Sequence, residues 1–296
     1  MIDVCVVTYR NEATIEPLIQ SVRRELPAAG ILVCDNSPDD GTRSVLRREA
    51  TKAGTTLRLL PPAGNIGFGA ACNRLAQASG EPWLVFLNPD AQLDQFDVDL
   101  GAVPSAALVG AVVHLEDGAP QVTFGTTRTL LEEVRIRLLR LPTRRPRIPD
   151  NGAQEVGFVS GAAFLVRRSD MLRWGGFDAG RYFMYYEDHD LCRRVRAGGG
   201  QVLVDDRFRV RHVGGYSAAR QRGLALRRSY DSALAYHRRW SRLSWLFPVV
   251  CAVEAIAKII VGLPRGRLGR TTTADQWSLL GHIVSGPRGW GHADAR

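Results

Sequence analysis

A carboxylate stands just beyond a short apolar stretch in the first third of the chain. Leu84 to Leu87 are apolar and predict a strand buried on both faces, which ends at Asn88, Pro89 and Asp90. Ligands of open α/β sheets bind beyond the carboxyl ends of the strands, so we expect Asp90 to face a ligand. Its carboxylate suits a divalent cation that bridges two phosphates. Asn-Pro-Asp is also ordinary turn chemistry, and a plain turn is the alternative.

A second group of carboxylates, Glu187, Asp188 and Asp190, follows an aromatic stretch at 183–186. Apolar residues at helical spacing from Leu191 onward predict that a helix begins near Glu187, with all three acids in its first turn. Acids at a helix N-terminus interact favourably with the helix dipole, and that role alone is one interpretation. The other is chemical, because an apolar neighbourhood raises the pKa of a carboxylate toward that of a general base.

The elements that must position these acids alternate along the first half of the chain. An apolar run at 4–9 is followed by helical apolar spacing at 12–25, and the run at 31–34 is followed by a second helical pattern at 44–53. Such alternation implies right-handed βαβ units and a parallel sheet. We therefore predict an α/β fold whose first half is a Rossmann-like nucleotide-binding unit.

Polar residues at the same expected sheet edge could contact a nucleotide. Asp35 directly follows the second strand, where it could accept hydrogen bonds from a base or a ribose, or could cap a turn. Gly67 and Gly69 resemble a dinucleotide-binding loop, but the full Gly-x-Gly-x-x-Gly pattern is not met. Both glycines still allow a close backbone approach, and Asn65 and Asn73 offer polar side chains beside them.

Composition restricts the partners. The 296 residues carry a net charge of +9, and Lys52 and Lys258 are the two lysines among 39 basic residues. Arginine favours contacts with phosphate, although a genomic bias toward arginine codons would look the same. No basic run is interleaved with aromatic residues, so we expect no nucleic acid partner. The five cysteines are scattered and the N-terminus has no signal-peptide pattern, so we expect a reduced, cytoplasmic protein.

Four segments together resemble a known family. They are residues 4–11, the Asp-Asn-Ser-Pro-Asp-Asp-Gly-Thr loop at 35–42, the Asn-Ile-Gly-Phe-Gly segment from Asn65 to Asn73, and Phe-Leu-Asn-Pro-Asp at 86–90. They resemble family-two glycosyltransferases of the A-type fold, and most of all the bacterial rhamnosyltransferase-like branch. The resemblance covers about residues 1–220. It implies a mixed, mainly parallel sheet and an enzyme that transfers a hexose.

The resemblance also implies roles in donor binding. In the family, the aspartate after the second strand contacts the nucleotide base, and an Asp-x-Asp motif holds Mn²⁺ or Mg²⁺ on the donor diphosphate. Asn88 replaces the first Asp of that motif, so we assign the metal to Asp90 and to His212, since family members often supply a histidine there. The residues expected to bind the nucleotide are Thr8, Arg10, Glu12, Asp35, Asn65, Asn73 and Asn88.

The acidic helix start resembles the family's catalytic motif, whose base deprotonates the acceptor hydroxyl. We assign this role to Asp188, with Glu187 as the alternative. Gly161, Tyr186 and Asp190 are assigned to the sugar site: the first as a wall beside the donor sugar, the second as part of an apolar surface and the third as an orienting or capping residue. On chemical grounds alone, Arg220 and Arg222 could close over the diphosphate.

The last part of the chain is expected to form amphipathic helices. Residues 243–263 are largely apolar but contain Pro248, Glu254 and Lys258, which makes a membrane-spanning helix marginal. Trp240, Trp245 and flanking arginines fit a helix lying in the membrane interface, and packing on the catalytic domain or on a dimer partner is the alternative. We expect a nucleotide-sugar half at 1–115, an acceptor half at 116–222 and a C-terminal helical region at 223–296.

The functional hypothesis is an inverting, metal-dependent glycosyltransferase of cell-surface polysaccharide synthesis. The resemblance points to dTDP-rhamnose as the donor, with a UDP-sugar as the alternative. A polyprenyl-diphosphate-linked saccharide at the inner face of the membrane would suit the basic, apolar C-terminal region, and a soluble glycan remains open. A sugar nucleotidyltransferase is one competitor, but residues 8–12 lack its Gly-rich, basic loop. A non-catalytic nucleotide-sugar-binding protein is the other.

Overall fold

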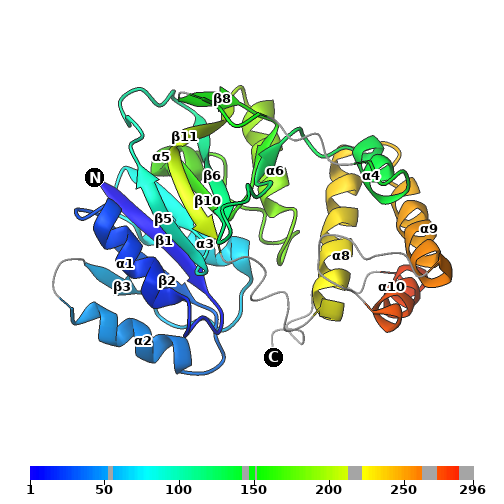
Figure 1. The fold of residues 1–296 in the computed structure, drawn as a ribbon, viewed down its shortest axis with the longest axis horizontal. Coiled ribbons are helices and arrows are strands. Elements are labelled where there is room, and N and C mark those ends of the chain that lie inside the picture. The colour runs from blue at the N-terminus through cyan, green and yellow to red at the C-terminus, as the bar shows by residue number, and fades with distance from the viewer. Residues whose placement is uncertain (53–55, 142–146, 151, 213–221, 262–271, 287–296) are drawn as a thin grey trace.

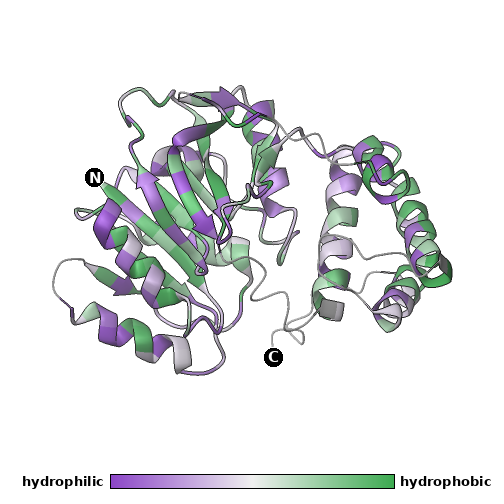
Figure 2. Ribbon diagram, viewed as in Figure 1, coloured by the Kyte–Doolittle hydropathy of each residue, from purple (hydrophilic) through white to green (hydrophobic). Residues whose placement is uncertain are grey.

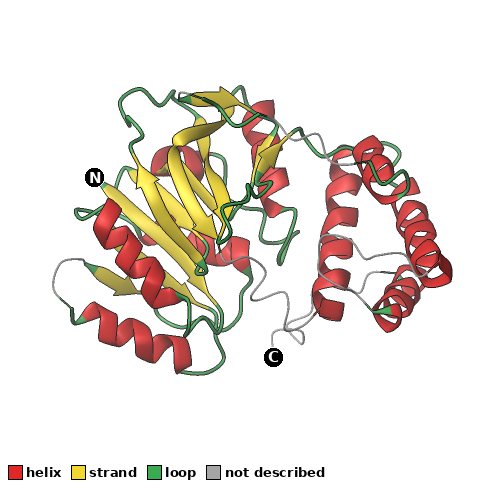
Figure 3. Ribbon diagram, in the orientation of Figure 1, coloured by secondary structure: helices red, strands yellow, loops and turns green. Residues whose placement is uncertain are grey.

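The computed structural model describes residues 1–52, 56–141, 147–150, 152–212, 222–261 and 272–286 of the chain. Figure 1 shows a twisted sheet with helices on both faces, beside a group of helices built mainly from the C-terminal part. Figure 3 shows the same division by element type, with the strands gathered in the first body and mostly helices in the second.

The first half alternates strands and helices, as predicted. Its elements are β1 (Ile2–Thr8), α1 (Ile15–Glu25), β2 (Gly30–Asp35), α2 (Gly41–Ala50), β3 (Leu57–Leu59), α3 (Phe68–Ala78) and β4 (Trp83–Leu87). These four strands are parallel and lie in the order β3-β2-β1-β4. Their carboxyl ends therefore meet at one edge, where the chain leaves Thr8, Asp35 and Leu87.

The second half completes a mixed sheet. Its elements up to His212 are β5 (Ala91–Phe96), β6 (Ala107–Leu115), β7 (Phe124–Gly125), α4 (Leu130–Arg137), β8 (Ala153–Glu155), β9 (Phe158–Val159), β10 (Ala163–Arg167), α5 (Arg168–Arg173), α6 (Glu187–Ala197) and β11 (Gln201–His212). The sheet continues from β4 as β10-β6-β11-β5, and β10 is antiparallel to both of its neighbours. The alternating sequence patterns at 202–206 and 208–212 predict two strands. The structure has one strand there, β11, whose register with β6 shifts between Asp205 and Arg209.

The core lies on both faces of the sheet, because alternate residues of each strand point to opposite sides. On one face, Val4 and Val6 pack with Ile15 and Leu18 of the amphipathic α1. On the other, Cys5 packs in a cluster that contains side chains of α3, α5 and α6. All five cysteines are buried and free, in agreement with the expected reduced state.

A helical bundle forms the second body. It consists of α4 with α8 (Arg222–Trp240), α9 (Leu246–Val261) and α10 (Thr273–Ser285). Its core contains Tyr230, Leu234 and Phe247, and Tyr182 and Tyr186 reach into it from the segment before α6. Although α4 was expected in the acceptor half, it packs on α9, with Arg137 and Glu254 2.7 Å apart. Among the helices that the structure describes, none has the length and hydropathy needed to cross a membrane.

Candidate active site

Asp90 and His212 meet at the carboxyl edge of the sheet. Asp90 lies in the turn that Pro89 imposes after β4, and His212 is the last residue of β11. Both side chains are buried, and His212 Nε2 lies 2.9 Å from Asp90 Oδ1. His212 Nδ1 lies 2.9 Å from Gln121 Oε1. The structure therefore brings together the two residues that sequence predicts as metal ligands, 122 positions apart.

The chemistry of this pair fits a divalent cation. Both ring nitrogens of His212 face an oxygen; when Nδ1 donates to Gln121, Nε2 is left with a lone pair, which a cation shared with Asp90 would accept. That lone pair and a carboxylate oxygen are metal-binding groups. The described residues contain no group of three or more protein ligands, and Mg²⁺ or Mn²⁺ on a nucleotide needs few, because phosphate and water supply the rest.

Asp188 lies at the start of α6, close to the end of β4. Its Oδ2 accepts a hydrogen bond from the Gly161 backbone N–H at 3.0 Å, and its Oδ1 accepts one from His189 N–H at 2.8 Å. The backbone carbonyl of Ala162, which follows Gly161, accepts a hydrogen bond from the Asn88 N–H at 2.8 Å. The backbone of Gly161 and Ala162 thus links the acidic helix start to the chain just before the turn that carries Asp90. Both predicted acidic groups lie near the carboxyl end of β4.

Gly161 has a steric reason to be glycine. A Cβ at this position would lie 3.0 Å from Phe68 Cε1 and 3.9 Å from Asp188 Cβ. A side chain there would press against the ring of Phe68, the first residue of α3. It would also disturb the hydrogen bond that Asp188 accepts from the Gly161 N–H. Gly161 therefore positions Asp188 through its backbone N–H.

Glu187 is the buried member of the acidic pair. Its side chain is 6% exposed, and Oε2 has no hydrogen-bond partner among the described residues. Burial, and secondly the charge of Asp188, raise the pKa of Glu187 to about 8. Near neutral pH, Glu187 is thus the protonated partner of a more accessible Asp188, which favours Asp188 over Glu187 as a proton acceptor.

Asp35 is fixed at the end of β2 by the loop after β1. Its Oδ1 accepts hydrogen bonds from the Thr8 hydroxyl at 2.8 Å and the Ser37 hydroxyl at 2.6 Å, and Arg43 lies 3.5 Å from Oδ2. Arg10 has a positive φ of 56° and donates its N–H to Ser37. The carboxylate is 3% exposed, so little of its surface is open to a ligand.

The remaining nucleotide-site predictions lie around this edge. Glu12 Oε1 accepts a hydrogen bond from the Thr42 hydroxyl at 3.3 Å, and Asn88 is half-buried beside Asp90. Asn65 Oδ1 accepts the Gly67 N–H at 3.3 Å in the loop before α3. These three positions are compatible with the prediction that they line the donor site.

Asn73 does not support its predicted role. Its amide donates to the Phe177 carbonyl at 2.8 Å and accepts the Phe177 N–H at 2.8 Å, so both ends of the side chain are occupied. Asn73 joins α3 to the segment before α6, which favours a structural role over nucleotide binding. Likewise, the close approach at Gly67 is to the Phe183 carbonyl, which would lie 2.5 Å from a Cβ.

Tyr186 and Asp190 also need correction as sugar contacts. The Tyr186 side chain is buried, and its hydroxyl donates to Glu133 at 2.7 Å inside the helical bundle. Asp190 is fully buried and accepts hydrogen bonds from Trp240 Nε1 at 2.8 Å and Arg194 Nε at 2.8 Å. Neither offers a free polar atom to a sugar. The geometry of Asp190 fits the orienting part of its prediction, since it ties α6 to α8.

The two arginines expected over the diphosphate receive no structural account. Arg220 lies outside the described residues, and of Arg222 only the backbone is described, as the first residue of α8. Sequence reasoning missed Gln121 and Glu133, which touch His212 and Tyr186. No local pattern marks either residue, because each acquires its partner only when segments distant in sequence pack together.

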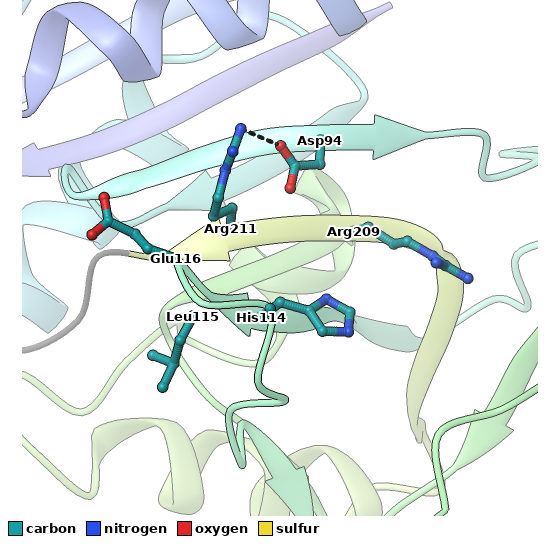
Figure 4. Close-up of a pocket in the computed structure, with 7 residues that line it drawn as sticks. Asp94, His114, Leu115, Glu116, Arg209 and Arg211 are labelled. Atoms are coloured by element: carbon teal, nitrogen blue, oxygen red, sulfur yellow. Dashed lines mark hydrogen bonds and ion pairs between the residues drawn. The ribbon is translucent and has the colours of Figure 1, made fainter.

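An open pocket elsewhere on the sheet does not coincide with this site. It is lined by Asp94, His114, Glu116, Arg209 and Arg211, and Arg211 and Asp94 form an ion pair at 3.0 Å (Figure 4). The two arginines alternate along β11 with Val210 and His212, so they point to the opposite face of the sheet.

Comparison with known proteins bears on what this edge does. The family model described as glycosyl transferase family 2 matches residues 3–173, which is more than half of the chain. The chain is 29% identical to an N-acetylglucosaminyl-diphospho-decaprenol L-rhamnosyltransferase of Mycobacterium tuberculosis, over 90% of this chain and 95% of the relative. It is 26% identical to the rhamnosyltransferase WbbL of Escherichia coli K12, over 72% of this chain and 83% of the relative.

Solved structures share the fold at low sequence identity. The mannosyltransferase PcManGT from Pyrobaculum calidifontis, in complex with GDP-Man and Mn²⁺, superposes with a TM-score of 0.55 at 16% identity, over 96% of this chain and 86% of that one. GalNAc-T7 with UDP, GalNAc and Mn²⁺ gives a TM-score of 0.57 at 16% identity, over 72% of this chain and 43% of that one. These likenesses confirm the predicted A-type fold.

Proposed function

The chain belongs to glycosyl transferase family 2, and from that premise we propose that it moves a sugar from a nucleoside diphosphate donor to a hydroxyl of a lipid-linked saccharide, with inversion at the anomeric carbon. One observation carries this proposal. Hydrogen bonds of 3.0 Å and 2.8 Å link Asp188, through the backbone of Gly161 and Ala162, to Asn88 at the end of β4, two residues before Asp90. A sugar held there would have a base on one side and its diphosphate on the other.

The donor would bind across the carboxyl ends of β1, β2 and β4. The loop after β1 and the buried Asp35 that it covers would together form the base site, and Asp90 with His212 would hold Mn²⁺ or Mg²⁺. When bound, the cation would neutralise charge on the departing diphosphate. The residues at 1–115 would thus form the donor half and those at 116–222 most of the acceptor half, although α4 belongs with the helices of 223–296.

Asp188 would remove the proton from the acceptor hydroxyl as its oxygen attacks the anomeric carbon. The bond to the new oxygen forms while the bond to the diphosphate oxygen breaks, which inverts the configuration. The Gly161 and His189 N–H groups hold the two oxygens of Asp188 and so fix the direction of its attack on the proton. Glu187, with its raised pKa of about 8, would stay protonated behind it.

The relatives suggest the substrates. One is named for transfer of L-rhamnose to N-acetylglucosaminyl-diphospho-decaprenol, so we propose dTDP-rhamnose as donor and a polyprenyl-diphosphate-linked saccharide as acceptor. A UDP-sugar is the alternative donor. An enzyme for such an acceptor would work at the inner face of the membrane, in the synthesis of a cell-surface polysaccharide.

The proposal is tested by transfer assays with the purified chain. We expect dTDP-rhamnose with Mn²⁺, but not without it, to raise the melting temperature and to give product on a short-chain polyprenyl-diphosphate N-acetylglucosamine. Asp188→Asn should lower turnover by about 10²- to 10⁴-fold while donor binding is kept, since a general base contributes that much. Asp99→Asn, at an exposed position after β5, is the matched control and should keep its turnover. Turnover of Asp188→Asn within twofold of the unchanged chain would refute the assigned base.

A further inference from the structure

Exposed apolar side chains are concentrated on the helical bundle. The described residues include thirteen large apolar side chains that are exposed, and eleven of them lie at 131–141 or 243–284. The other two, Met1 and Leu172, lie on the sheet body, although it is the larger of the two bodies. Contiguous apolar surface of this kind marks a site of interaction, whereas single exposed residues do not.

The centre of this surface is one side of α9. Trp245, just before the helix, and Val249, Val253, Ile256 and Ile260 follow one another at intervals of three or four residues, which places them along one stripe. Their exposed fractions range from 44% at Ile256 to 76% at Ile260. Figure 2 shows α9 as strongly hydrophobic, on the side of the bundle away from the sheet.

The polar residues of α9 all face inward. Glu254 pairs with Arg137 of α4 at 2.7 Å and with Lys258 at 2.6 Å, and Phe247 and Cys251 pack in the bundle core. Within α9 itself, the outer stripe therefore carries neither charge nor a hydrogen-bonding side chain, and Trp245, just before the helix, adds an indole at its end. A helix face of this composition is typical of a surface that binds an apolar partner.

The charge of the C-terminal region indicates which partner binds the stripe. Residues 223–296 contain eleven Lys and Arg against four Asp and Glu, a net charge of +7 out of +9 for the whole chain. Two copies of this surface would bring like charges together, whereas an anionic lipid surface attracts them. Trp245 at one end of the stripe and Trp277 on α10, each more than 60% exposed, suit the level of the lipid headgroups.

We propose that the α9 stripe docks the chain on an anionic membrane surface, with the helix lying in the interface rather than crossing the bilayer. Burial of the stripe among lipid and attraction of the basic bundle to anionic headgroups would act together. The inference rests on the proposed function for its purpose, since a docked enzyme would meet a lipid-linked acceptor. Vesicle binding can nevertheless be measured without any transfer.

The test is flotation of the full chain with vesicles of phosphatidylcholine, alone or with about a third of phosphatidylglycerol. We expect binding to the anionic vesicles, and weaker binding at high salt. The double substitution Val249→Ser with Ile256→Ser should weaken binding by roughly tenfold or more, because two buried aliphatic side chains are lost. Leu172→Ser on α5, 40% exposed, is the matched control and should bind like the unchanged chain.

Three results would overturn the docking proposal. The first is that the unchanged chain does not bind anionic vesicles, and the second is that the double variant binds them equally well with an unchanged melting temperature. The third is a dimer in light scattering that the double variant converts to monomers, because the stripe would then be an interface between two copies. Vesicle binding without sugar transfer would refute the proposed function alone, and transfer to a soluble acceptor without vesicle binding would refute the docking alone.

Discussion

Glu187 shows how burial sets the chemistry of a single residue. Burial and the charge of Asp188 raise its pKa from 4.5 to about 8, so the folded chain keeps a proton that the unfolded chain releases near pH 4.5. The stabilisation is complete below about pH 4.5 and is lost as the pH rises to about 8. Relative to Glu187→Gln, the free energy of unfolding of the unchanged chain should fall by up to about 1.4 kcal/mol per pH unit in this window.

Urea denaturation at intervals between pH 5 and pH 8 measures this difference. Glu155→Gln, on the exposed edge strand β8, is the control and should follow the unchanged chain at every pH. Parallel curves for Glu187→Gln and the unchanged chain would contradict the raised pKa and with it the protonated state of Glu187.

Gln121 would act on a bound metal through His212. It lies 2.9 Å from Nδ1 and so sets which ring nitrogen turns toward Asp90. Gln121→Ala should weaken Mn²⁺ affinity by about 10- to 100-fold, the usual cost of losing such an outer partner, without loss of fold. Titration of Mn²⁺ followed by calorimetry measures this effect, with Gln154→Ala on exposed β8 as the control. Unchanged affinity would mean that His212 does not bind the metal.

Sequence predicted the residues that follow strand ends and did not predict the ones that pack. Asp35 and Asp90 stand directly after apolar runs, so the fold class alone brings them to one edge. Asn73 and Tyr186 were also assigned to the site, but their hydrogen-bond partners lie 104 and 53 positions away. Their side chains are used in joining elements, and no local spacing distinguishes that use from binding a ligand.

Among elements, the turn before α6 is the one on which the site depends most. Tyr185 and Tyr186 both have positive φ, at 74° and 63°, a conformation that costs a non-glycine residue about 1–3 kcal/mol. The Tyr186 hydroxyl holds this turn by its 2.7 Å bond to Glu133 on α4. Burial would raise the pKa of Glu133, but Arg137, the hydrogen bonds with His237 and Tyr186, and Arg128 together outweigh burial and lower the pKa, so the carboxylate stays ionised. The strained turn is therefore held by a hydrogen bond to the charged carboxylate of Glu133.

Removal of the Tyr186 hydroxyl should loosen this turn. Tyr186→Phe should cost about 1.5–3 kcal/mol, as hydrogen bonds to charged groups do, and should lower kcat while KM for the donor stays unchanged, because Asp188 is two residues away and the donor edge is not touched. Tyr230→Phe removes a buried hydroxyl from α8 instead and is the control. If KM for the donor rose as much as kcat fell, the effect would be general unfolding rather than misplacement of Asp188.

Element order was predicted better than element boundaries. The βαβ alternation gave the parallel strands, and the apolar spacing after Glu187 gave the start of α6. β11 was expected as two strands because Asp205 to Arg207 interrupt the apolar pattern, yet Arg207 and Asp205 pair at 2.7 Å and allow one strand to continue through a register shift. The position of α4 depends on its contact with α9, far along the chain, which sequence does not reveal.

In the whole molecule, the sheet body and the helical bundle are joined at Asp190. This buried carboxylate of α6 accepts the Trp240 indole N–H at 2.8 Å, and Arg239 lies 3.2 Å from it and 2.9 Å from Asp178. Both partners come from the end of α8, so the bundle supplies groups that the body needs. The expected boundary at residue 223 thus separates two parts of the chain that share hydrogen bonds, because Asp190 on one side depends on donors from α8 on the other.

Substitution at this junction should therefore destabilise both bodies together. Trp240→Phe keeps most of the volume but removes the indole donor, and the poorly satisfied carboxylate of Asp190 should cost about 1–3 kcal/mol. We expect a lower melting temperature in one cooperative transition and slower turnover, since α6 also carries Asp188. Arg238→Ala, at an exposed position two residues earlier, should change neither. Two separate transitions in calorimetry, with turnover kept, would instead mean that the bundle is an independent domain beside a complete catalytic body.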